Sequence, residues 1–129
     1  SLHCPLTEQT KYLINDYSIS KMKDGVMIIN TGRGQLIHTN ALIEGLKNKK
    51  IGSAGLDVYE EESQYFYEDR SDKIIDDDTL ARLLSFNNVI VTSHQAYFTQ
   101  EALSNIATTT LQNVRDFTQG KALENEVKL

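Results

Sequence analysis

Residues 27–34 read Met-Ile-Ile-Asn-Thr-Gly-Arg-Gly, an apolar run that ends abruptly in a polar turn. A second run of this kind, residues 89–91, stops at Thr-Ser-His. Short, uniformly apolar runs are typical of strands that are covered on both faces, as in parallel sheets. Residues 51–59 predict a weaker third strand, because their two glycines indicate close backbone approach. Residues 2–4 predict the end of a fourth strand.

Helical patterns lie between these runs. Asp16, Thr39 and Asp78 are each placed to cap a helix, and Gly25 is placed to end the first one. The clearest helix comes last: apolar residues recur every three or four positions from 103 to 117, and Gly120 ends it. Strands and helices that alternate in this way predict an α/β fold with a parallel sheet and right-handed crossovers.

The composition sets limits on the partners. The chain has 129 residues, a length typical of one domain, with 13 basic and 18 acidic residues and a formal charge of −5. This acidity argues against a nucleic-acid partner. No apolar run approaches the roughly 20 residues of a transmembrane helix, so we expect no membrane partner. A single cysteine, Cys4, fits a reducing compartment, and we expect a cytoplasmic protein.

Residues that follow the strands are the candidates for chemistry, because open α/β sheets bind ligands at the carboxyl ends of their strands. Arg33 follows the first strand, Asp57 and three glutamates the next, and His94 the last. An arginine suits a substrate carboxylate, and a histidine beside a carboxylate can donate a proton near neutral pH. Alone, each is more often structural or solvent-facing; together they predict a site for a small acid bearing a carbonyl or hydroxyl group.

Several motifs are absent. Gly32 and Gly34 do not complete Gly-x-Gly-x-x-Gly, because position 37 is Ile37. The chain has no P-loop, and no His and Cys residues have zinc-site spacing, so we expect no metal. Any phosphate-binding loop must lie outside these residues. We therefore expect this chain to be a fragment of a longer protein.

Four segments, in this order, resemble the D-isomer-specific 2-hydroxyacid dehydrogenases: residues 2–7, 22–34, 55–62 and 92–96. Three features resemble the fermentative D-lactate branch in particular: Asp-Val-Tyr-Glu-x-Glu at 57–62, the acidic and aromatic stretch after it, and His-Gln-Ala-Tyr-Phe-Thr at 94–99. The resemblance covers essentially the whole chain. The three aromatic residues at 65–67 also predict that the acidic stretch packs against the rest of the domain.

This resemblance implies a partial Rossmann-like, doubly wound and mostly parallel sheet. Residues 1–97 would be the C-terminal half of the NAD-binding domain, and residues 98–129 a helix and tail that return to the substrate domain. The implied reaction is the NADH-dependent reduction of pyruvate to D-lactate by hydride transfer, with a 2-keto or 2-hydroxy acid as the small-molecule partner. The full-length protein would be a homo-oligomer, and the fragment alone would be inactive.

The resemblance also implies roles for individual residues. His94 would give a proton to the carbonyl oxygen, Glu62 would keep His94 protonated, and Arg33 would hold the substrate carboxylate. Tyr97 would contact the substrate methyl group, while Glu60 and Glu61 would face solvent. NAD contacts are implied at a set of loop residues, with Asp57 beside the nicotinamide carboxamide: Cys4, Pro5, Thr10, Thr31, Gly32, Arg33 and Asp57.

The chain departs from the family in two respects, and two alternatives stay open. Ser93 stands where many relatives have proline, and the family's chains are more than twice as long. The substrate could instead be another 2-keto acid, such as hydroxypyruvate or phenylpyruvate. The chain could also belong to an NADH-sensing module like the family's transcriptional corepressors. These residues do not decide between NAD and NADP.

Overall fold

The computed structural model describes residues 1–61 and 77–128. It divides the chain into two compact units, Ser1–Gln95 and Ala96–Leu129. The division falls two residues before the boundary expected from the sequence. The expected packing of the acidic and aromatic stretch, and the expected role of Glu62, concern residues 62–76 and lie outside the described residues.

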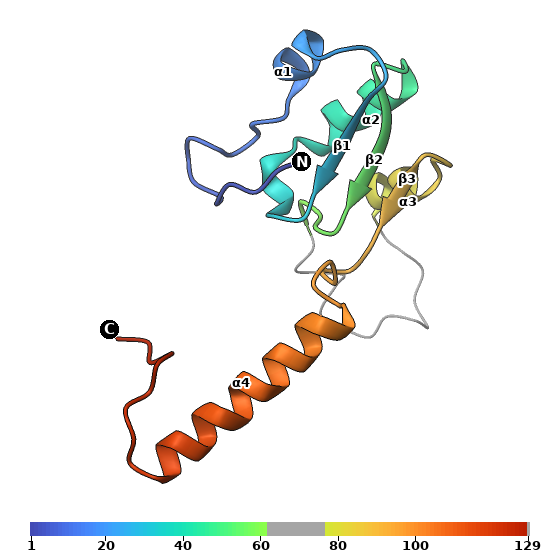
Figure 1. Cartoon of the computed structure of the whole chain (residues 1–129). Helices are drawn as coiled ribbons and strands as arrows, with labels where there is room; N and C mark the ends of the chain where they lie inside the picture. The colour runs from blue at the N-terminus through green and yellow to red at the C-terminus, as the bar shows by residue number, and fades with distance from the viewer. Residues whose placement is uncertain (62–76, 129) are drawn as a thin grey trace. The chain divides into compact units, whose positions relative to one another are not determined.

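A parallel sheet forms the centre of the first unit (Figure 1). Its strands are β1 (Val26–Asn30), β2 (Ile51–Leu56) and β3 (Val89–Val91), in the order β1-β2-β3, and both pairs are parallel. Leu2 adds a single parallel bridge to Asn30, which is all that the expected fourth strand contributes. The predicted parallel α/β fold is confirmed, although β2 ends three residues earlier than expected.

The described α-helices of this unit form one layer on one face of the sheet, in which the second and third helices pack on the strands and the first packs against the second. They are α1 (Asp16–Lys21), α2 (Thr39–Lys47) and α3 (Asp78–Leu84), and a short 3-10 helix, η1 (Gly34–Leu36), precedes α2. Their buried side chains share one core with alternate residues of the strands: Ile19, Leu42, Leu46, Leu80, Leu83, Ile28, Ala54 and Leu56. This core anchors the carboxyl ends of the strands, where the candidate site lies.

The predicted N-caps were each wrong by one residue. Asn15, not Asp16, caps α1, and its side chain accepts a hydrogen bond from the Ser18 N–H. Asp77, not Asp78, caps α3. Thr39 is the first residue of α2 rather than its cap, and its hydroxyl donates to the Glu60 carboxylate instead. Neighbouring polar residues compete for a cap, and the one whose oxygen reaches the second or third N–H prevails.

The other face of the sheet is open. Met27 is 63% exposed and Ile90 is 70% exposed, and both lie with Gly55 along an apolar hollow on this face. The prediction that the apolar strands are covered on both faces is therefore wrong for the described part of the chain. Alternate residues of the strands still divide cleanly between the two faces: Ile28 is buried against the helices, whereas Met27 is not.

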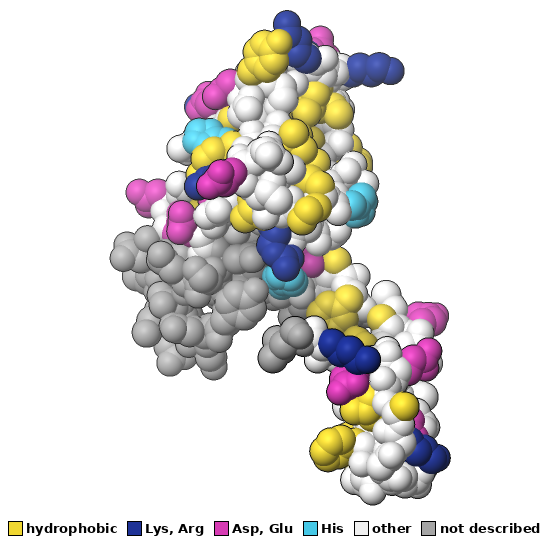
Figure 2. Space-filling model, turned by 90° about the vertical axis from the view of Figure 1, so that its left-hand side faces the viewer, with side chains coloured by type: hydrophobic (Ala, Val, Ile, Leu, Met, Phe, Trp, Pro, Cys, Tyr) yellow, Lys and Arg dark blue, Asp and Glu magenta, His cyan; other side chains and the backbone are white. Residues whose placement is uncertain are grey.

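The second unit contains one long helix, α4 (Gln100–Thr118), whose N-cap is Thr99. Gly120, in the left-handed conformation at φ 64°, follows the end of the helix as predicted. The predicted apolar stripe is present, but none of its residues is buried. Figure 2 shows hydrophobic side chains on the surface of this unit among charged ones. No helix among the described residues is long and apolar enough to cross a bilayer.

Gly34 provides a test of how tightly the site is packed. A β-carbon at this position would lie 1.9 Å from the Tyr59 carbonyl oxygen, a backbone atom that cannot move aside. We expect Gly34→Ala to lower the free energy of unfolding by about 3 kcal/mol, the upper range for overpacking. Gly55→Ala is the control, because its β-carbon would meet only the flexible end of Ile29, at 3.0 Å. Equal urea midpoints for the two variants would contradict this packing.

Candidate active site

Three expected site residues follow the carboxyl ends of adjacent strands. Arg33 lies in the turn after β1, Asp57 directly follows β2, and His94 lies in the turn after β3. Two backbone hydrogen bonds continue the ladder beyond the strands. The Asp57 N–H donates to the Asn30 carbonyl at 2.9 Å, and the His94 N–H donates to the Asp57 carbonyl at 2.8 Å. The three segments are thereby held together at one edge of the sheet.

Asn30 shapes the turn that carries Arg33. Its side chain is fully buried; its Oδ1 accepts from the Gly32 N–H at 3.0 Å and its Nδ2 donates to the Arg33 carbonyl at 2.9 Å. Arg33 is exposed, and its Nη1 donates to the Gly32 carbonyl at 2.9 Å. Asn30 was not among the predicted site residues, although an amide at the end of an apolar strand could have indicated this role.

Asp57 holds the turn that carries His94. Its side chain is only 5% exposed, and its Oδ1 accepts hydrogen bonds from the Thr92 hydroxyl and, at 2.7 Å, from the Gln95 N–H. His94 is half-buried with φ 58°, a left-handed conformation that is unfavourable for residues other than glycine. Because Asp57 bonds residues on both sides of His94, it holds the backbone of the turn in this strained conformation. Thr92 was also missed by the sequence analysis.

The loop after residue 2 and the turn after β1 line an open hollow of about 480 Å³. Five of the expected NAD contacts line it: Cys4, Pro5, Thr31, Gly32 and Arg33. Thr10 lies behind the loop, where its hydroxyl donates to the Pro5 carbonyl at 2.7 Å. A β-carbon on Gly32 would meet Leu36 at 3.3 Å and the Leu2 carbonyl oxygen at 3.5 Å, so the turn packs closely beneath the hollow. His3 and Leu6 complete the lining of this hollow.

Glu60 does not face solvent, contrary to the expectation from the sequence. Its Oε1 accepts from the Tyr12 hydroxyl at 2.5 Å, and its Oε2 accepts from the N–H and the hydroxyl of Thr39 at 3.1 and 2.7 Å. The carboxylate thus satisfies donors at the amino end of α2, where backbone N–H groups have no partner within the helix. Burial alone would raise the pKa of Glu60, but the hydrogen bonds from Tyr12 and Thr39 hold it below its ordinary value.

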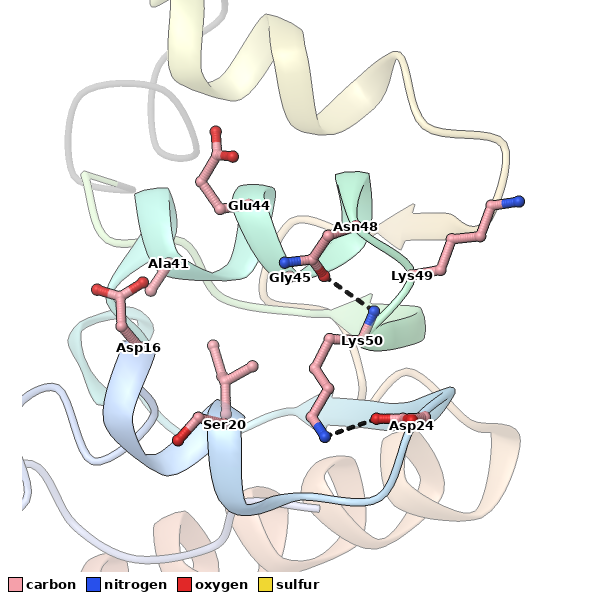
Figure 3. A pocket seen from close by; sticks show the side chains of 10 residues that line it. Asp16, Ser20, Asp24, Ala41, Glu44, Gly45, Asn48, Lys49 and Lys50 are labelled. Carbon is pink, nitrogen blue, oxygen red and sulfur yellow. Dashed lines mark hydrogen bonds and ion pairs between the residues drawn. The ribbon is translucent and has the colours of Figure 1, made fainter.

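A larger hollow, of about 650 Å³, lies between α1 and α2 (Figure 3). It adjoins Asp24, just before β1, and Lys50, just before β2, so it lies at the amino ends of the strands. The Lys50 Nζ donates to Asp24 at 2.6 Å across one side of it. This hollow is at the opposite end of the sheet from Arg33 and His94, and we do not assign the reaction to it.

The structure does not test the placement of two expected site residues at the carboxyl edge of the sheet. Glu62 lies outside the described residues. Tyr97 belongs to the second unit, where its exposed ring packs edge-on against Phe98 at 6.3 Å between centroids. Within residues 1–61 and 77–128, no group of three His, Cys, Asp or Glu residues could hold a metal ion.

Comparison with known proteins identifies the family. The family model for the NAD binding domain of the D-isomer specific 2-hydroxyacid dehydrogenases matches residues 1–96. The chain belongs to this family. It is 52% identical to a 2-hydroxyacid dehydrogenase homolog of Haemophilus influenzae and 51% identical to the D-lactate dehydrogenase of Escherichia coli, in each case over 98% of the chain. It spans only 38% and 39% of those two relatives.

Solved structures of the dehydrogenases show the same fold. The D-lactate dehydrogenase of Treponema pallidum superposes on 99% of this chain with a TM-score of 0.86 at 38% identity. The NAD⁺ complex of the Lactobacillus jensenii D-lactate dehydrogenase superposes with a TM-score of 0.86 at 34% sequence identity. The pyruvate reductase of Chlamydomonas reinhardtii superposes with a TM-score of 0.83 at 46% identity. This chain covers 39% of the first, and 38% of each of the other two. The family model therefore identifies residues 1–96 as belonging to an NAD binding domain.

The charge of Glu60 should make stability depend on pH. A carboxyl group whose pKa is lowered by folding stabilises the protein above its unfolded pKa, and this contribution is lost as the pH falls through the folded value. We expect Glu60→Gln to destabilise the protein at pH 7 by about 1–2 kcal/mol, because hydrogen bonds to a charged acceptor are stronger. The difference from the unmodified protein should shrink below about pH 4.

Thermal unfolding at pH 7 and pH 3 measures this effect. Glu61→Gln is the matched control, because Glu61 is the exposed neighbour of Glu60 and its loss of charge should change stability little. A Glu60→Gln deficit that stays constant from pH 7 to pH 3 would show that the charge of Glu60 is not what stabilises the fold.

Proposed function

We propose that this chain is part of an NADH-dependent reductase that converts pyruvate to D-lactate. One observation carries the proposal: the ladder bonds at Asp57 bring the Arg33 turn and the His94 turn to one edge of a sheet whose family binds NAD. The D-lactate dehydrogenases among its relatives support the choice of substrate. Because the chain spans under two fifths of those relatives, the reaction is proposed for the complete protein.

Arg33 would hold the substrate. Its guanidinium lies exposed at the rim of the hollow, and a guanidinium presents two parallel N–H donors that match a carboxylate. The Asn30 side chain fixes the backbone of Arg33. The turn that carries the guanidinium would therefore not need to become ordered when the substrate binds. Arg33 would thus bind the pyruvate carboxylate and draw electron density from the adjacent carbonyl.

His94 would act as the acid. When bound in the hollow, NADH supplies a hydride to the keto carbon. The protonated imidazole of His94 donates its ring proton to the carbonyl oxygen as negative charge develops there. We propose Glu62 as the carboxylate that keeps this imidazole protonated. Asp57, whose side chain binds Thr92 and Gln95, maintains the position of the histidine, and its contact with the nicotinamide carboxamide stays a prediction.

The division of the chain between two domains is also a proposal. Residues 1–97 would complete the cofactor domain, and residues 98–129 would return to the substrate domain. The stripe of exposed apolar side chains along α4 supports this, because a stripe at helical spacing is built to be covered by another element. A reductase of another 2-keto acid would use the same residues, so a substrate panel on the complete enzyme tests the choice of pyruvate.

Replacing His94 tests the proton donor. We expect His94→Asn, in the full-length enzyme, to lower kcat for pyruvate reduction by about 10²–10⁴-fold, the usual contribution of a general acid. Binding of NADH, followed by its fluorescence, should change little. The D-lactate product is measured by a stereospecific assay. Loss of less than tenfold in kcat would exclude His94 as the acid, and failure of the unmodified enzyme to reduce any 2-keto acid would exclude the proposed function.

Replacing Arg33 by lysine tests substrate binding. A lysine keeps the charge but loses the planar fork, so we expect Arg33→Lys chiefly to raise the KM for pyruvate, by about tenfold or more. Arg82→Lys is the control, because Arg82 lies on α3 over the Phe86 ring and not at the carboxyl edge. Steady-state kinetics at saturating NADH separates the two constants. An unchanged KM together with a lower kcat would place Arg33 elsewhere in the mechanism.

A further inference from the structure

Tyr12 has a backbone conformation that needs an explanation. Its φ is 54°, in the left-handed region that a bulky side chain rarely adopts. Such strained residues persist only where surrounding contacts hold them. The contacts of Tyr12 are numerous, and together they join three segments that are far apart in the sequence.

The first contact is made by the backbone. The Tyr12 N–H donates to the Gln35 carbonyl at 2.8 Å, and two residues later the Ile14 N–H donates to the Leu36 carbonyl at 3.0 Å. The segment after the loop of residues 3–10 is thereby bonded to η1, which directly follows Arg33. The loop and the Arg33 turn are the two walls of the hollow.

The second contact is made by the side chain. The Tyr12 hydroxyl donates to Glu60, which Thr39 fixes at the amino end of α2. This hydrogen bond raises the pKa of Tyr12, so the hydroxyl keeps its proton and remains a donor at neutral pH. Other titratable groups near Tyr12 are the Lys11 Nζ, 5.2 Å from the ring centre, the His38 ring at 5.0 Å, and the Glu61 carboxylate.

We propose that Tyr12 and Glu60 form a clamp that positions the loop of residues 3–10 against the turn of residues 31–33, and so sets the width of the cofactor-binding hollow. This inference rests on the proposed function, since it takes the hollow to bind NADH. Neither residue lines the hollow, so both act as positioning residues. With the clamp intact, the two walls of the hollow are ordered before NADH binds, so less of the binding free energy is lost in ordering them.

The test is Tyr12→Phe in the full-length enzyme, which removes the hydroxyl and keeps the ring. Without the bond to Glu60 the loop has more freedom, and we expect the Kd and KM for NADH to rise about three- to tenfold, the equivalent of one net hydrogen bond. The kcat at saturating NADH should stay within about twofold, because the His94 turn is held separately by Asp57. NADH fluorescence gives the Kd directly and needs no substrate.

Tyr17→Phe is the matched control, because Tyr17 lies on α1, is 74% exposed and would lose the same hydroxyl. The clamp is supported if Tyr12→Phe weakens NADH binding and Tyr17→Phe does not. It is overturned if the two variants bind NADH equally, or if Tyr12→Phe only lowers the melting temperature. The two proposals fail separately, because the Kd for NADH is measured without pyruvate. An enzyme that binds NADH but reduces no 2-keto acid would contradict the proposed function. The clamp would still be tested by the Kd values of the two variants.

Discussion

The arrangement of the site depends on two hydrogen bonds that continue the parallel ladder past the last regular residues of the strands. One links Asp57 to the Asn30 carbonyl, and the other links His94 to the Asp57 carbonyl. Parallel strands end at a common edge, but their loops would ordinarily diverge there. Because the backbone of Asp57 bonds to both neighbours, the arginine turn on one side and the histidine turn on the other keep the register of the sheet. The spacing of the two turns therefore follows from the backbone hydrogen bonds of the ladder.

Two carboxylates then fix the segments that the hydrogen bonds of the ladder do not reach. Asp57 and Glu60 are separated by two buried residues, Val58 and Tyr59, and each carboxylate accepts hydrogen bonds from a different part of the chain. A buried or half-buried carboxylate is costly unless its oxygens are satisfied, so each one imposes a definite position on its donors. Asp57 fixes the position of the segment that follows β3, and Glu60 fixes the positions of α2 and Tyr12. The short segment after β2 therefore organises both sides of the site.

The sequence predicted the strands, the helices and the edge that carries Arg33 and His94, because these follow from apolar periodicity and from the general rule on where α/β sheets bind ligands. It failed where polar residues compete for one partner. Asp16 was predicted as a cap, but its neighbour Asn15 also has a side-chain oxygen that can cap a helix, and only the backbone geometry separates the two. Glu60 stood in a run of three glutamates that looked solvated, since its partners, Tyr12 and Thr39, are 48 and 21 residues away. Long-range pairing of this kind leaves no local pattern to read.

The exposed apolar surfaces follow from the same reasoning about periodicity. Val26–Asn30 and Val89–Val91 have apolar side chains on both faces, a pattern that suits strands lying between two layers of helices. The described helices of the first unit form one layer, and Met27 and Ile90 on the other face remain open. Exposed apolar area of this extent is unfavourable in water, so the sequence is consistent with cover on both faces. The apolar residues on both faces of β1 and β3 therefore did not predict the one-sided layer that the described helices form, because the sequence pattern alone does not distinguish a face that helices cover from a face that they leave open.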